Sequence, residues 1–326
     1  MVSTHPLWHD YPNLSQNLNQ VEAVINQHIR IKNKKIEAQI RRVAENSGKM
    51  LRPVYALLCS QIGPDYDEEK AIAIAAALET LHMATLVHDD VIDEADLRRG
   101  QETLHAKKDN RYAIYAGDYL FSICFTILAN HTNSVSMLEY NARSMEKVLI
   151  GELDQLESRY TSPKSIKRYL ARISGKTAQL FALSCYTGAV ESNASKRQTR
   201  LAYNAGHYIG MAFQIIDDIL DYQANDNTLG KPAMADAKNG IYTLPLIYSY
   251  QNHATEIDAL LTKQSLTSED LHDLQALIDQ ADGLSKALQL AKRYTKKALS
   301  TIDKLPNGEY KAILKSITEK MLARTM

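Results

Sequence analysis

The chain has 326 residues, of which 45% are hydrophobic, enough for one large domain or two small ones with a sizeable core. Lys and Arg together number 38, as do Asp and Glu, so the formal net charge is zero. This balance argues against a global electrostatic role in binding nucleic acid or a membrane surface and leaves only local basic patches to consider.

The cysteines and the apolar segments bear on the cellular compartment. Cys59, Cys124 and Cys185 have no spacing typical of metal sites or disulfide frameworks, which predicts buried thiols in a reducing environment. The N-terminal residues lack a basic and then apolar signal pattern. The most apolar run, residues 71–87, is interrupted by Glu79 and His82 and ends in acidic residues, so it predicts a buried helix rather than a membrane span. We therefore expect a soluble, cytoplasmic protein.

Apolar residues recur at three- and four-residue steps along the whole chain, which is typical of helices. The first such segment is residues 14–40. Turns are expected at residues 46–53, where Gly48 ends a helix and Pro53 suits the first turn of the next, and at residues 62–69 before the long apolar helix. The further segments expected to be helical are 111–129, 133–156, 162–174, 175–190, 194–222, 242–250, 253–261, 268–280, 283–302 and 309–322. Residues 225–240 are polar, contain Gly and Pro, and predict a loop.

Two acidic clusters stand out, each at the end of an apolar helical segment. Their members are Asp89, Asp90 and Asp93, and then Asp217, Asp218 and Asp221. Residues four apart lie on one face of a helix, so each cluster offers a pair of adjacent carboxylates. One such cluster alone is usually a solvated helix face. Two within apolar helices indicate metal binding, because carboxylates are costly to bury unless they are paired or bound to metal.

The pattern as a whole predicts an all-α protein. No alternating apolar run competes with helix, and no shift in composition marks a linker. We expect a single domain over residues 1–326, with the two acidic clusters facing each other across the core of a helix bundle.

A site rich in carboxylates, without thiolates and with few histidines, suits a hard cation. Mg²⁺ is typically held by one or two carboxylates together with substrate phosphates, so the clusters imply a phosphate-bearing ligand. The basic residues that could match it are Lys49, Arg52, Arg98, Arg99, Lys176 and Lys231. Each taken alone is most often a solvated surface charge. Lys176 follows Gly175, but the spacing is not that of a nucleotide P-loop.

Seven motifs in order carry a family resemblance: GKMLRP, LHMATLVHDDVIDEADLRRG, AGDYLF, GELDQL, GKTA, FQIIDDILD and LGKP with TLPLIY. With them the chain resembles the trans-isoprenyl (polyprenyl) diphosphate synthases over essentially its whole length. The medium-chain bacterial members that make hexaprenyl, heptaprenyl or geranylgeranyl diphosphate look nearest. The resemblance implies an isoprenoid-synthase-type helix bundle with a central active-site cavity, and dimerisation with itself or with a small second subunit.

The resemblance also implies a reaction. An allylic diphosphate (geranyl, farnesyl or geranylgeranyl) ionises, isopentenyl diphosphate attacks the cation, and a proton is lost. About three Mg²⁺ ions would bind with the diphosphate. The residues that would bind Mg²⁺ are Asp89, Asp93 and Asp217, supported by Asp90, Asp218 and Asp221. The elongated, hydrophobic product would be passed to a membrane.

The remaining roles also follow from the resemblance. Lys49, Arg52, His82 and Arg99 would bind the diphosphate of isopentenyl diphosphate, and Arg98, Lys176 and Lys231 would bind the allylic diphosphate. Thr177 and Gln214 would lie near the developing cation, and Phe213 would pack beside the homoallylic substrate. From the residues alone, His82 is equally well explained as an ordinary helix histidine, and a phenylalanine such as Phe213 is more often a plain core residue.

The chain departs from the family pattern at a few positions. Ser47 stands where a Gly is usual, Met234 stands where another Gly is usual, and Ile241 replaces a lysine that contacts the allylic diphosphate in relatives. Lys238, whose position differs by three residues, is a candidate to replace that contact. The C-terminal sequence also lacks the doubled basic residues found in some relatives.

Product length is expected to depend on the residue five before the first aspartate, which is aromatic in short-chain members. Here it is Ala84, followed by Thr85, so the resemblance implies a product longer than farnesyl diphosphate (C15), between about C20 and C35. One helical turn rises about 5.4 Å, which is comparable to one extended isoprene unit. The next barriers along the chain's helices would be Leu81, Leu78, Ile123, Ile127 or Ile150.

Three alternative functions stay open at this point. The first is the catalytic large subunit of an obligate two-component heptaprenyl diphosphate synthase. A non-catalytic partner subunit fits less well because both acidic clusters are complete. An HD-type metal phosphohydrolase would use His82, His88, Asp89 and Asp217, but the second cluster supplies no histidine. Terpene cyclases and head-to-head synthases lack the GKxxRP motif.

Overall fold

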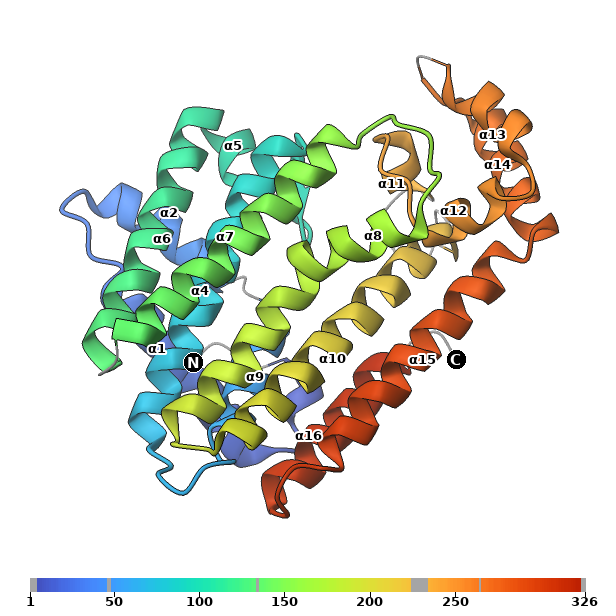
Figure 1. The fold of residues 1–326 in the computed structure, drawn as a ribbon. Helices are drawn as coiled ribbons and strands as arrows, with labels where there is room; N and C mark the ends of the chain where they lie inside the picture. The colour runs from blue at the N-terminus through green and yellow to red at the C-terminus, as the bar shows by residue number, and fades with distance from the viewer. Residues whose placement is uncertain (1–4, 46–47, 133–134, 224–233, 264, 324–326) are drawn as a thin grey trace. The chain divides into compact units, whose positions relative to one another are not determined.

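The structure is a computed structural model that describes residues 5–45, 48–132, 135–223, 234–263 and 265–323 (Figure 1). The chain divides into two compact units, one made of Met1–Ala142 and Leu183–Ala202 and the other of Arg143–Ala182 and Tyr203–Met326. Helices dominate both units, so the prediction of an all-α protein is confirmed. The single domain over residues 1–326 stays a prediction.

The first unit is organised around α4, the long helix Glu68–Ile92, whose residues are mostly buried. Its start is set by Asp67, whose side chain accepts a hydrogen bond from the backbone N–H of Lys70 at 3.1 Å. Helix α4 packs most extensively against α6 (Asn110–His131), and the two lie side by side in Figure 1. The other elements that lie wholly in this unit are η1 (Pro6–Trp8), α1 (Pro12–His28), α2 (Lys34–Glu45), α3 (Leu51–Cys59), β1 (Leu97–Arg98), β2 (Gln101–Glu102) and α5 (Leu104–Lys107). The turn at residues 46–53, as far as it is described, and the break at 62–69 are where the sequence predicts them.

Among the described residues, two helices are long and apolar enough to cross a membrane by length and composition alone. They are α4, whose most apolar stretch is 78% buried within the protein, and α6, for which that share is 44%. Core helices of soluble proteins pass the same test, so these two are weak evidence for a span. The buried position of α4 agrees with its prediction as a core helix. The three cysteines are free and buried, also as predicted.

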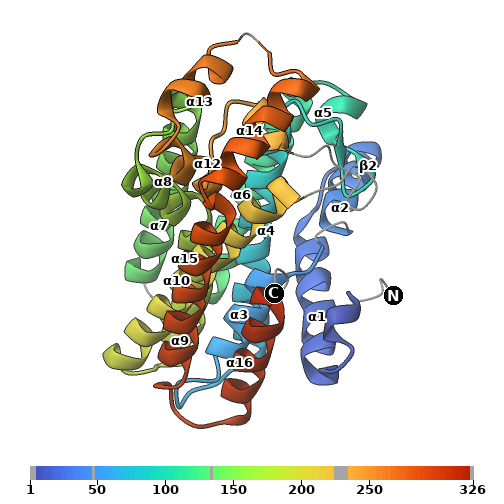
Figure 2. The same ribbon diagram turned by 90° about the vertical axis from the view of Figure 1, so that its right-hand side faces the viewer.

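The second unit contains the C-terminal helices around a hydrophobic cluster that includes Tyr222, Leu246, Leu274 and Ile278. Helices α15 and α16 run beside each other in Figures 1 and 2. The elements that lie wholly in this unit are α8 (Ile166–Ile173), η2 (Ser174–Ala178), α11 (Ala235–Lys238), α12 (Leu244–Tyr250), α13 (Ala254–Leu261), α14 (Ser268–Gln280), α15 (Gly283–Ile302) and α16 (Glu309–Leu322). Helices α7 (Val135–Glu157), α9 (Gln179–Glu191) and α10 (Lys196–Gln223) have residues in both units.

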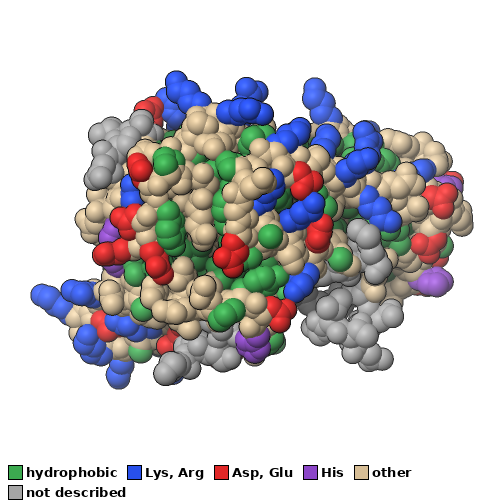
Figure 3. Space-filling view, turned by 90° about the horizontal axis from the view of Figure 1, so that it is seen from below, with side chains coloured by type: hydrophobic (Ala, Val, Ile, Leu, Met, Phe, Trp, Pro, Cys, Tyr) green, Lys and Arg blue, Asp and Glu red, His purple; other side chains and the backbone are tan. Residues whose placement is uncertain are grey.

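Charged side chains of both signs are mixed over the face of the molecule displayed in Figure 3. Basic and acidic groups alternate there with apolar side chains. This mixture agrees with the formal net charge of zero.

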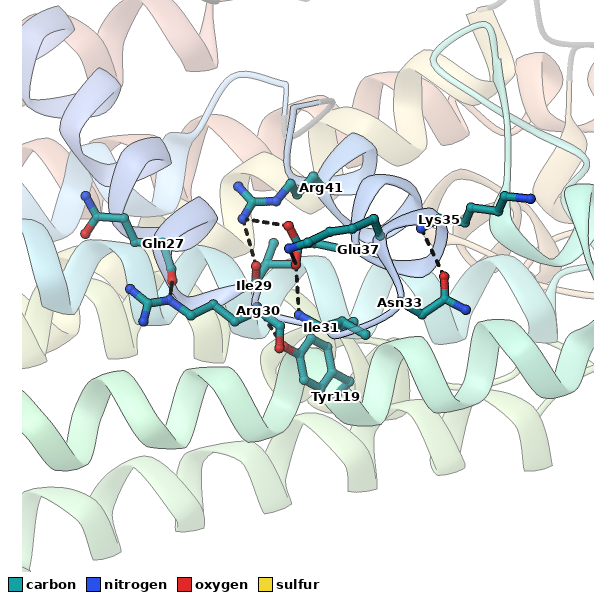
Figure 4. Close-up of polar contacts among 10 residues, drawn as sticks. Gln27, Ile29, Arg30, Ile31, Asn33, Lys35, Glu37, Arg41 and Tyr119 are labelled. Carbon is teal, nitrogen blue, oxygen red and sulfur yellow. Dashed lines mark hydrogen bonds and ion pairs between the residues drawn. The ribbon is translucent and has the colours of Figure 1, made fainter.

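The periodic segment 14–40 is two helices rather than one. Helix α1 ends at His28 and α2 begins at Lys34. Tertiary contacts hold the break (Figure 4): Arg41 donates to the carbonyl of Ile29 at 2.8 Å, and Glu37 accepts from the N–H of Ile31 at 2.9 Å. The hydroxyl of Tyr119 on α6 contacts the backbone of Arg30. The apolar spacing continues across this break, so periodicity alone does not reveal it.

A short hairpin follows α4 that the sequence pattern does not predict. Strands β1 and β2 pair antiparallel, with Leu97 opposite Glu102 and Arg98 opposite Gln101. Arg99 and Gly100 between them have φ values of 53° and 76°, as the two central residues of a type I′ turn require. Two-residue strands are too short to show alternation, but the hairpin matters because it carries both arginines of the LRRG sequence.

Candidate active site

The first acidic cluster lies at the C-terminal end of α4. Asp89 is in the last turn, and Asp93 is the C-terminal cap, whose backbone N–H donates to the carbonyl of Asp89 at 2.8 Å. The side chain of Asp89 is partly exposed and that of Asp93 is exposed, whereas Asp90 is only 7% exposed. The cluster therefore separates into two accessible carboxylates at i and i+4 and one buried carboxylate between them.

Asp90 is paired with Arg98. The Nε–H of Arg98 donates to Oδ1 of Asp90 at 2.5 Å, and the backbone carbonyl of Asp90 accepts from Ala95 at 2.9 Å. Burial is the main cause that raises the pKa of Asp90, and Arg98 opposes it. This ion pair fixes the hairpin to the end of α4.

Arg99, the next residue, lies against the turn that precedes α3. A Cβ atom at Gly48 would lie 2.3 Å from Cζ of Arg99, so the guanidinium group occupies the space that a side chain would take. Gly48 also has a φ of 79°, in the region that favours glycine. The indole of Trp8 donates to the carbonyl of Lys49 at 3.0 Å and so anchors the same turn. The structure thus brings Lys49 and Arg99 to one place.

Arg52 and His82 interact electrostatically with Arg99. We call Lys49, Arg52, His82 and Arg99 the basic group. Burial lowers the pKa of Arg52 to about 10, and its electrostatic neighbours are Glu79 and Arg99. Burial also holds the pKa of His82 well below its usual value, and the charges of Arg52, Arg99 and Arg98 lower it further. His82 is therefore neutral at pH 7 and able to donate a hydrogen bond without adding charge. The first unit gathers the four residues predicted to bind one diphosphate: Lys49, Arg52, His82 and Arg99.

The second acidic cluster lies near the C-terminal end of α10, in the second unit. Asp217 is exposed, Asp218 is 3% exposed and Asp221 is partly exposed. Asp218 accepts from the hydroxyl of Tyr169 at 2.6 Å and from the amide of Gln214 at 2.7 Å. Burial raises the pKa of Asp218 to about 8, against the effect of these two hydrogen bonds. As in the first cluster, the middle aspartate is buried and held by neighbouring side chains.

The hydrogen-bond chain continues to the GKTA sequence. Thr177 donates its hydroxyl to Oε1 of Gln214 at 2.6 Å, so Thr177, Gln214, Asp218 and Tyr169 form one continuous chain. Phe213 lies beside Phe181, with ring centroids 5.5 Å apart. The structure thus brings together Thr177 and Gln214, the two residues predicted to lie near the reacting carbon.

Lys176 lies in a π-helical turn, η2, between α8 and α9. Such turns insert an extra residue into a helix and are frequent at functional sites. Lys176 pairs with Oε2 of Glu152 on α7 at 2.7 Å. A Cβ atom at Gly151 would lie 2.7 Å from the backbone nitrogen of Lys176, so glycine is needed for this close approach. The turn was not predicted, because the sequence pattern only indicated a boundary between two helices.

The polar segment 225–240 is described only from Met234 onward, and the predicted ligand Lys231 lies outside the described residues. Asp221 accepts from the backbone N–H groups of Ala235 and Asp236 at 3.2 and 3.3 Å. Asp221 therefore fixes the start of α11 to the end of α10. Ile241, which replaces the usual lysine, is only 9% exposed, and Lys238 is exposed.

The residues expected to limit product length are mostly buried in the first unit. Ala84 has no exposed surface, and Leu78, Leu81, Ile123 and Ile127 are at most 5% exposed. These side chains come from α4 and α6, the two helices that pack most extensively on each other. Ile150 differs, because its side chain is 50% exposed.

Each acidic cluster by itself offers oxygen donors of the kind that a hard divalent cation prefers. In the first unit Asp89 is partly exposed and Asp93 is exposed, while Asp90 is held by Arg98. In the second unit Asp217 is exposed, while Asp218 is held by Tyr169 and Gln214. Within the described part of the chain, no three His, Cys, Asp or Glu side chains are grouped closely enough to hold a metal ion by themselves. Mg²⁺ commonly binds to few carboxylates and completes its shell with substrate phosphates and water, so the few accessible carboxylates of each cluster are compatible with such an ion.

Comparison with known proteins decides the family. The family model described as Polyprenyl synthetase matches residues 33–280. The chain belongs to the polyprenyl synthetase family. The chain is 35% identical over 309 residues to heptaprenyl diphosphate synthase component 2 of Bacillus subtilis, covering 95% of this chain and 88% of the relative. The predicted family is therefore confirmed.

Two solved structures show the same fold. The geranylgeranyl pyrophosphate synthase of Lactobacillus brevis has a TM-score of 0.92 and 37% sequence identity, with 98% of this chain and 99% of that chain covered. The polyprenyl synthase of Caulobacter crescentus, solved with calcium and isoprenyl diphosphate, has a TM-score of 0.89 and 28% identity, with 99% of each chain covered. This polyprenyl synthetase has the all-α fold of its relatives. The predictions of a trans-prenyltransferase and of products longer than C15 are confirmed.

Sequence reasoning missed several residues that organise the polyprenyl synthetase site. Trp8, Glu152 and Tyr169 position predicted residues through contacts with distant parts of the chain. Glu152 lies within the GELDQL motif, so the motif offered a signal for it. Trp8, the chain's single tryptophan, and Tyr169 had no motif to mark them.

Proposed function

We propose that this polyprenyl synthetase condenses isopentenyl diphosphate with an allylic diphosphate, with Mg²⁺ as its metal, to make an all-trans product between geranylgeranyl (C20) and heptaprenyl (C35) diphosphate. The observation that carries the proposal is the basic group in the first unit. Arg52 and Arg99 lie within electrostatic reach of a neutral His82, and Arg99 lies against the turn of Gly48 and Lys49. Arginine matches diphosphate oxygens with paired hydrogen bonds, which suits this group to a diphosphate.

The reaction breaks one bond and forms another. The allylic C–O bond breaks and leaves a carbocation and a diphosphate. The double bond of isopentenyl diphosphate attacks the cation to form the new C–C bond. A proton then leaves the neighbouring carbon, and the departing diphosphate takes it up. The protein needs no covalent nucleophile for this sequence.

The aspartates and the remaining basic residues act on the leaving diphosphate. We assign Asp89, Asp93 and Asp217 to Mg²⁺, which would neutralise the charge that develops on the leaving group. Arg98, Lys176 and Lys231 bind the allylic diphosphate directly. Asp90 and Asp218 orient their neighbours, supported by the hydrogen bonds to Arg98 and Tyr169. Asp221 acts with them as a support by holding the start of α11.

Thr177 and Gln214 stabilise the cation by their dipoles. The hydroxyl of Thr177 donates to the carbonyl oxygen of Gln214, which leaves the lone pairs of the hydroxyl oxygen available to face positive charge. Phe213 supplies an apolar ring for the homoallylic substrate. Prearranged dipoles of this kind stabilise a developing charge without having to reorient during the reaction.

The experiment that tests the proposal is incubation of the purified chain with Mg²⁺, labelled isopentenyl diphosphate and farnesyl diphosphate. The expected result is an elongated prenyl diphosphate. Withdrawal of Mg²⁺ with a chelator should abolish it, and calcium offers a comparison metal. The single catalytic domain over residues 1–326 and the cytoplasmic location, with transfer of the product to a membrane, belong to the same proposal.

A second candidate is the catalytic subunit of a two-component synthase. It is supported by the 35% identity to heptaprenyl diphosphate synthase component 2 of Bacillus subtilis. Under this candidate the chain alone is inactive, and a small second subunit restores activity. A homodimer that elongates farnesyl diphosphate unaided distinguishes the first candidate, and light scattering of the purified chain gives its oligomeric state.

A further inference from the structure

Glu79 is a buried acidic residue in the middle of α4 to which the proposed reaction gives no role. Its exposed fraction is 1%, and neither of its carboxyl oxygens has a hydrogen-bond partner among the described residues. An acidic group buried without hydrogen bonds is costly, and native proteins keep few of them. A carboxylate in the core of the first unit therefore needs a nearby positive charge to stabilise it.

Two guanidinium groups supply that charge. Burial raises the pKa of Glu79 to about 7, while Arg52 and Arg99 act to lower it. In return, the carboxylate raises the pKa of both arginines, against the effect of their own burial. His82 follows Glu79 by three residues and so lies on the same face of α4. Glu79 thus belongs to the charge cluster of the basic group.

We propose that Glu79 is a positioning residue that acts by charge, balancing Arg52 and Arg99 while the site is empty and repelling the diphosphate of isopentenyl diphosphate once it is bound. The inference rests on the proposed function, which gives these arginines that diphosphate. Because Glu79 makes no hydrogen bond to the described residues, it acts on the two arginines through its electrostatic field.

The chemistry gives such a repulsion a use. The diphosphate that enters on isopentenyl diphosphate stays attached to the elongated product after each condensation. It must leave the basic group before another isopentenyl diphosphate can bind. A fixed negative charge weakens the grip of the arginines on this diphosphate and so favours its departure. Binding that is too tight in the ground state slows turnover.

The test compares Glu79→Gln with Glu191→Gln. Gln keeps the shape of the side chain and removes its charge. Glu191 is a matched control, because its side chain is 8% exposed in the same unit and is paired with Lys70, away from the basic group. Thermal unfolding is followed with and without inorganic diphosphate, and steady-state kinetics are measured at about pH 8, above the raised pKa of Glu79 of about 7.

We expect both variants to unfold at a lower temperature without ligand. Inorganic diphosphate should raise the unfolding temperature of Glu79→Gln more than that of the wild type, and leave the shift of Glu191→Gln unchanged. In Glu79→Gln the KM for isopentenyl diphosphate should fall about three- to tenfold, because removal of one nearby negative charge tightens diphosphate binding. The kcat should fall as well, because the product diphosphate then leaves the basic group more slowly. The KM for the allylic substrate should not change. Glu79→Asp, which keeps the charge, should retain the wild-type response.

Other outcomes would overturn either the inference about Glu79 or the proposed function. An unchanged or higher KM for isopentenyl diphosphate in Glu79→Gln, with a diphosphate shift equal to that of the wild type, overturns the inference and leaves the proposed function intact. If Glu79→Gln folds only with inorganic diphosphate present, the counter-charge role is supported; failure to fold with diphosphate overturns it. A wild-type chain that neither responds to diphosphate nor catalyses condensation overturns the proposed function itself.

Discussion

Arg98 donates its Nε–H to Oδ1 of Asp90 at 2.5 Å, so the second aspartate of the first cluster holds an arginine of the hairpin. Its neighbour Asp89 is partly exposed in the last turn of α4. The two adjacent aspartates therefore have different roles. Asp89 is the proposed metal ligand, and Asp90 positions Arg98, which is proposed to bind the allylic diphosphate.

This division predicts different losses on neutralising the two carboxylates. Asp89→Asn should lower kcat/KM about a hundred- to a thousandfold, as loss of a charge-stabilising group does. Asp90→Asn should lower it only about tenfold, mainly through a higher KM for the allylic diphosphate, because an uncharged partner holds Arg98 less firmly. Steady-state kinetics with each substrate varied in turn measures both effects. Equal losses in the two variants would contradict the division.

Substitutions at Gly48 and Gly100 distinguish the effect of backbone strain from the effect of a new contact with Arg99. Gly48 and Gly100 both have positive φ values, 79° and 76°, so substitution by Ala costs each about 1 kcal/mol of stability. Only at Gly48 would the new Cβ atom meet the guanidinium group of Arg99, since nothing lies within 4 Å at Gly100. Gly48→Ala should therefore raise the KM for isopentenyl diphosphate severalfold while Gly100→Ala does not. Similar kinetics for the two variants would remove Gly48 from the site.

His82 should act as an uncharged group. Its lowered pKa means that the unfolded chain binds more protons than the folded protein below about pH 6.5, so stability should fall as the pH falls below that value. His82→Gln keeps a neutral donor and should keep the KM for isopentenyl diphosphate within about threefold, whereas His82→Ala should raise it about tenfold. His82→Gln should also remove part of the stability loss in acid, which a thermal melt from about pH 7 to pH 5 measures. A KM for His82→Gln as high as that of His82→Ala would show that the imidazole is needed for its charge or shape.

Ala84 should control product length. Its fully buried position on α4 leaves room for a chain that an aromatic ring would block. Ala84→Tyr should shorten the product to about C15, at a cost of about 1–3 kcal/mol of stability for overpacking. Chromatography of the labelled products, with thermal melts to check folding, tests this. A product of unchanged length from a folded variant would show that the barrier lies elsewhere.

Local patterns predicted most of the fold and the acidic clusters. The helical spacing of apolar residues is a local property, and so is the i and i+4 placement of Asp89 and Asp93. The break between α1 and α2 was not predicted, because the helical spacing of apolar residues continues across it. Contacts of Arg41, Glu37 and Tyr119 hold the break instead (Figure 4).

The supporting residues of the site depend on tertiary contacts. Tyr169 holds Asp218 from a different helix, and Trp8 anchors Lys49 from a distance of 41 residues along the chain. Glu79 was visible in the sequence only as an interruption of an apolar run. Its relation to Arg52 and Arg99 emerges when α3, α4 and the hairpin come together.

The most direct test of the central claim is the product of the purified chain alone with Mg²⁺, labelled isopentenyl diphosphate and farnesyl diphosphate. An autonomous polyprenyl synthetase of the proposed kind yields a product between about C20 and C35, given the room that Ala84 leaves, and Asp89→Asn forms it about a hundred- to a thousandfold less efficiently. No product from the chain alone, with none restored by a small partner subunit from a two-component synthase, would contradict the account.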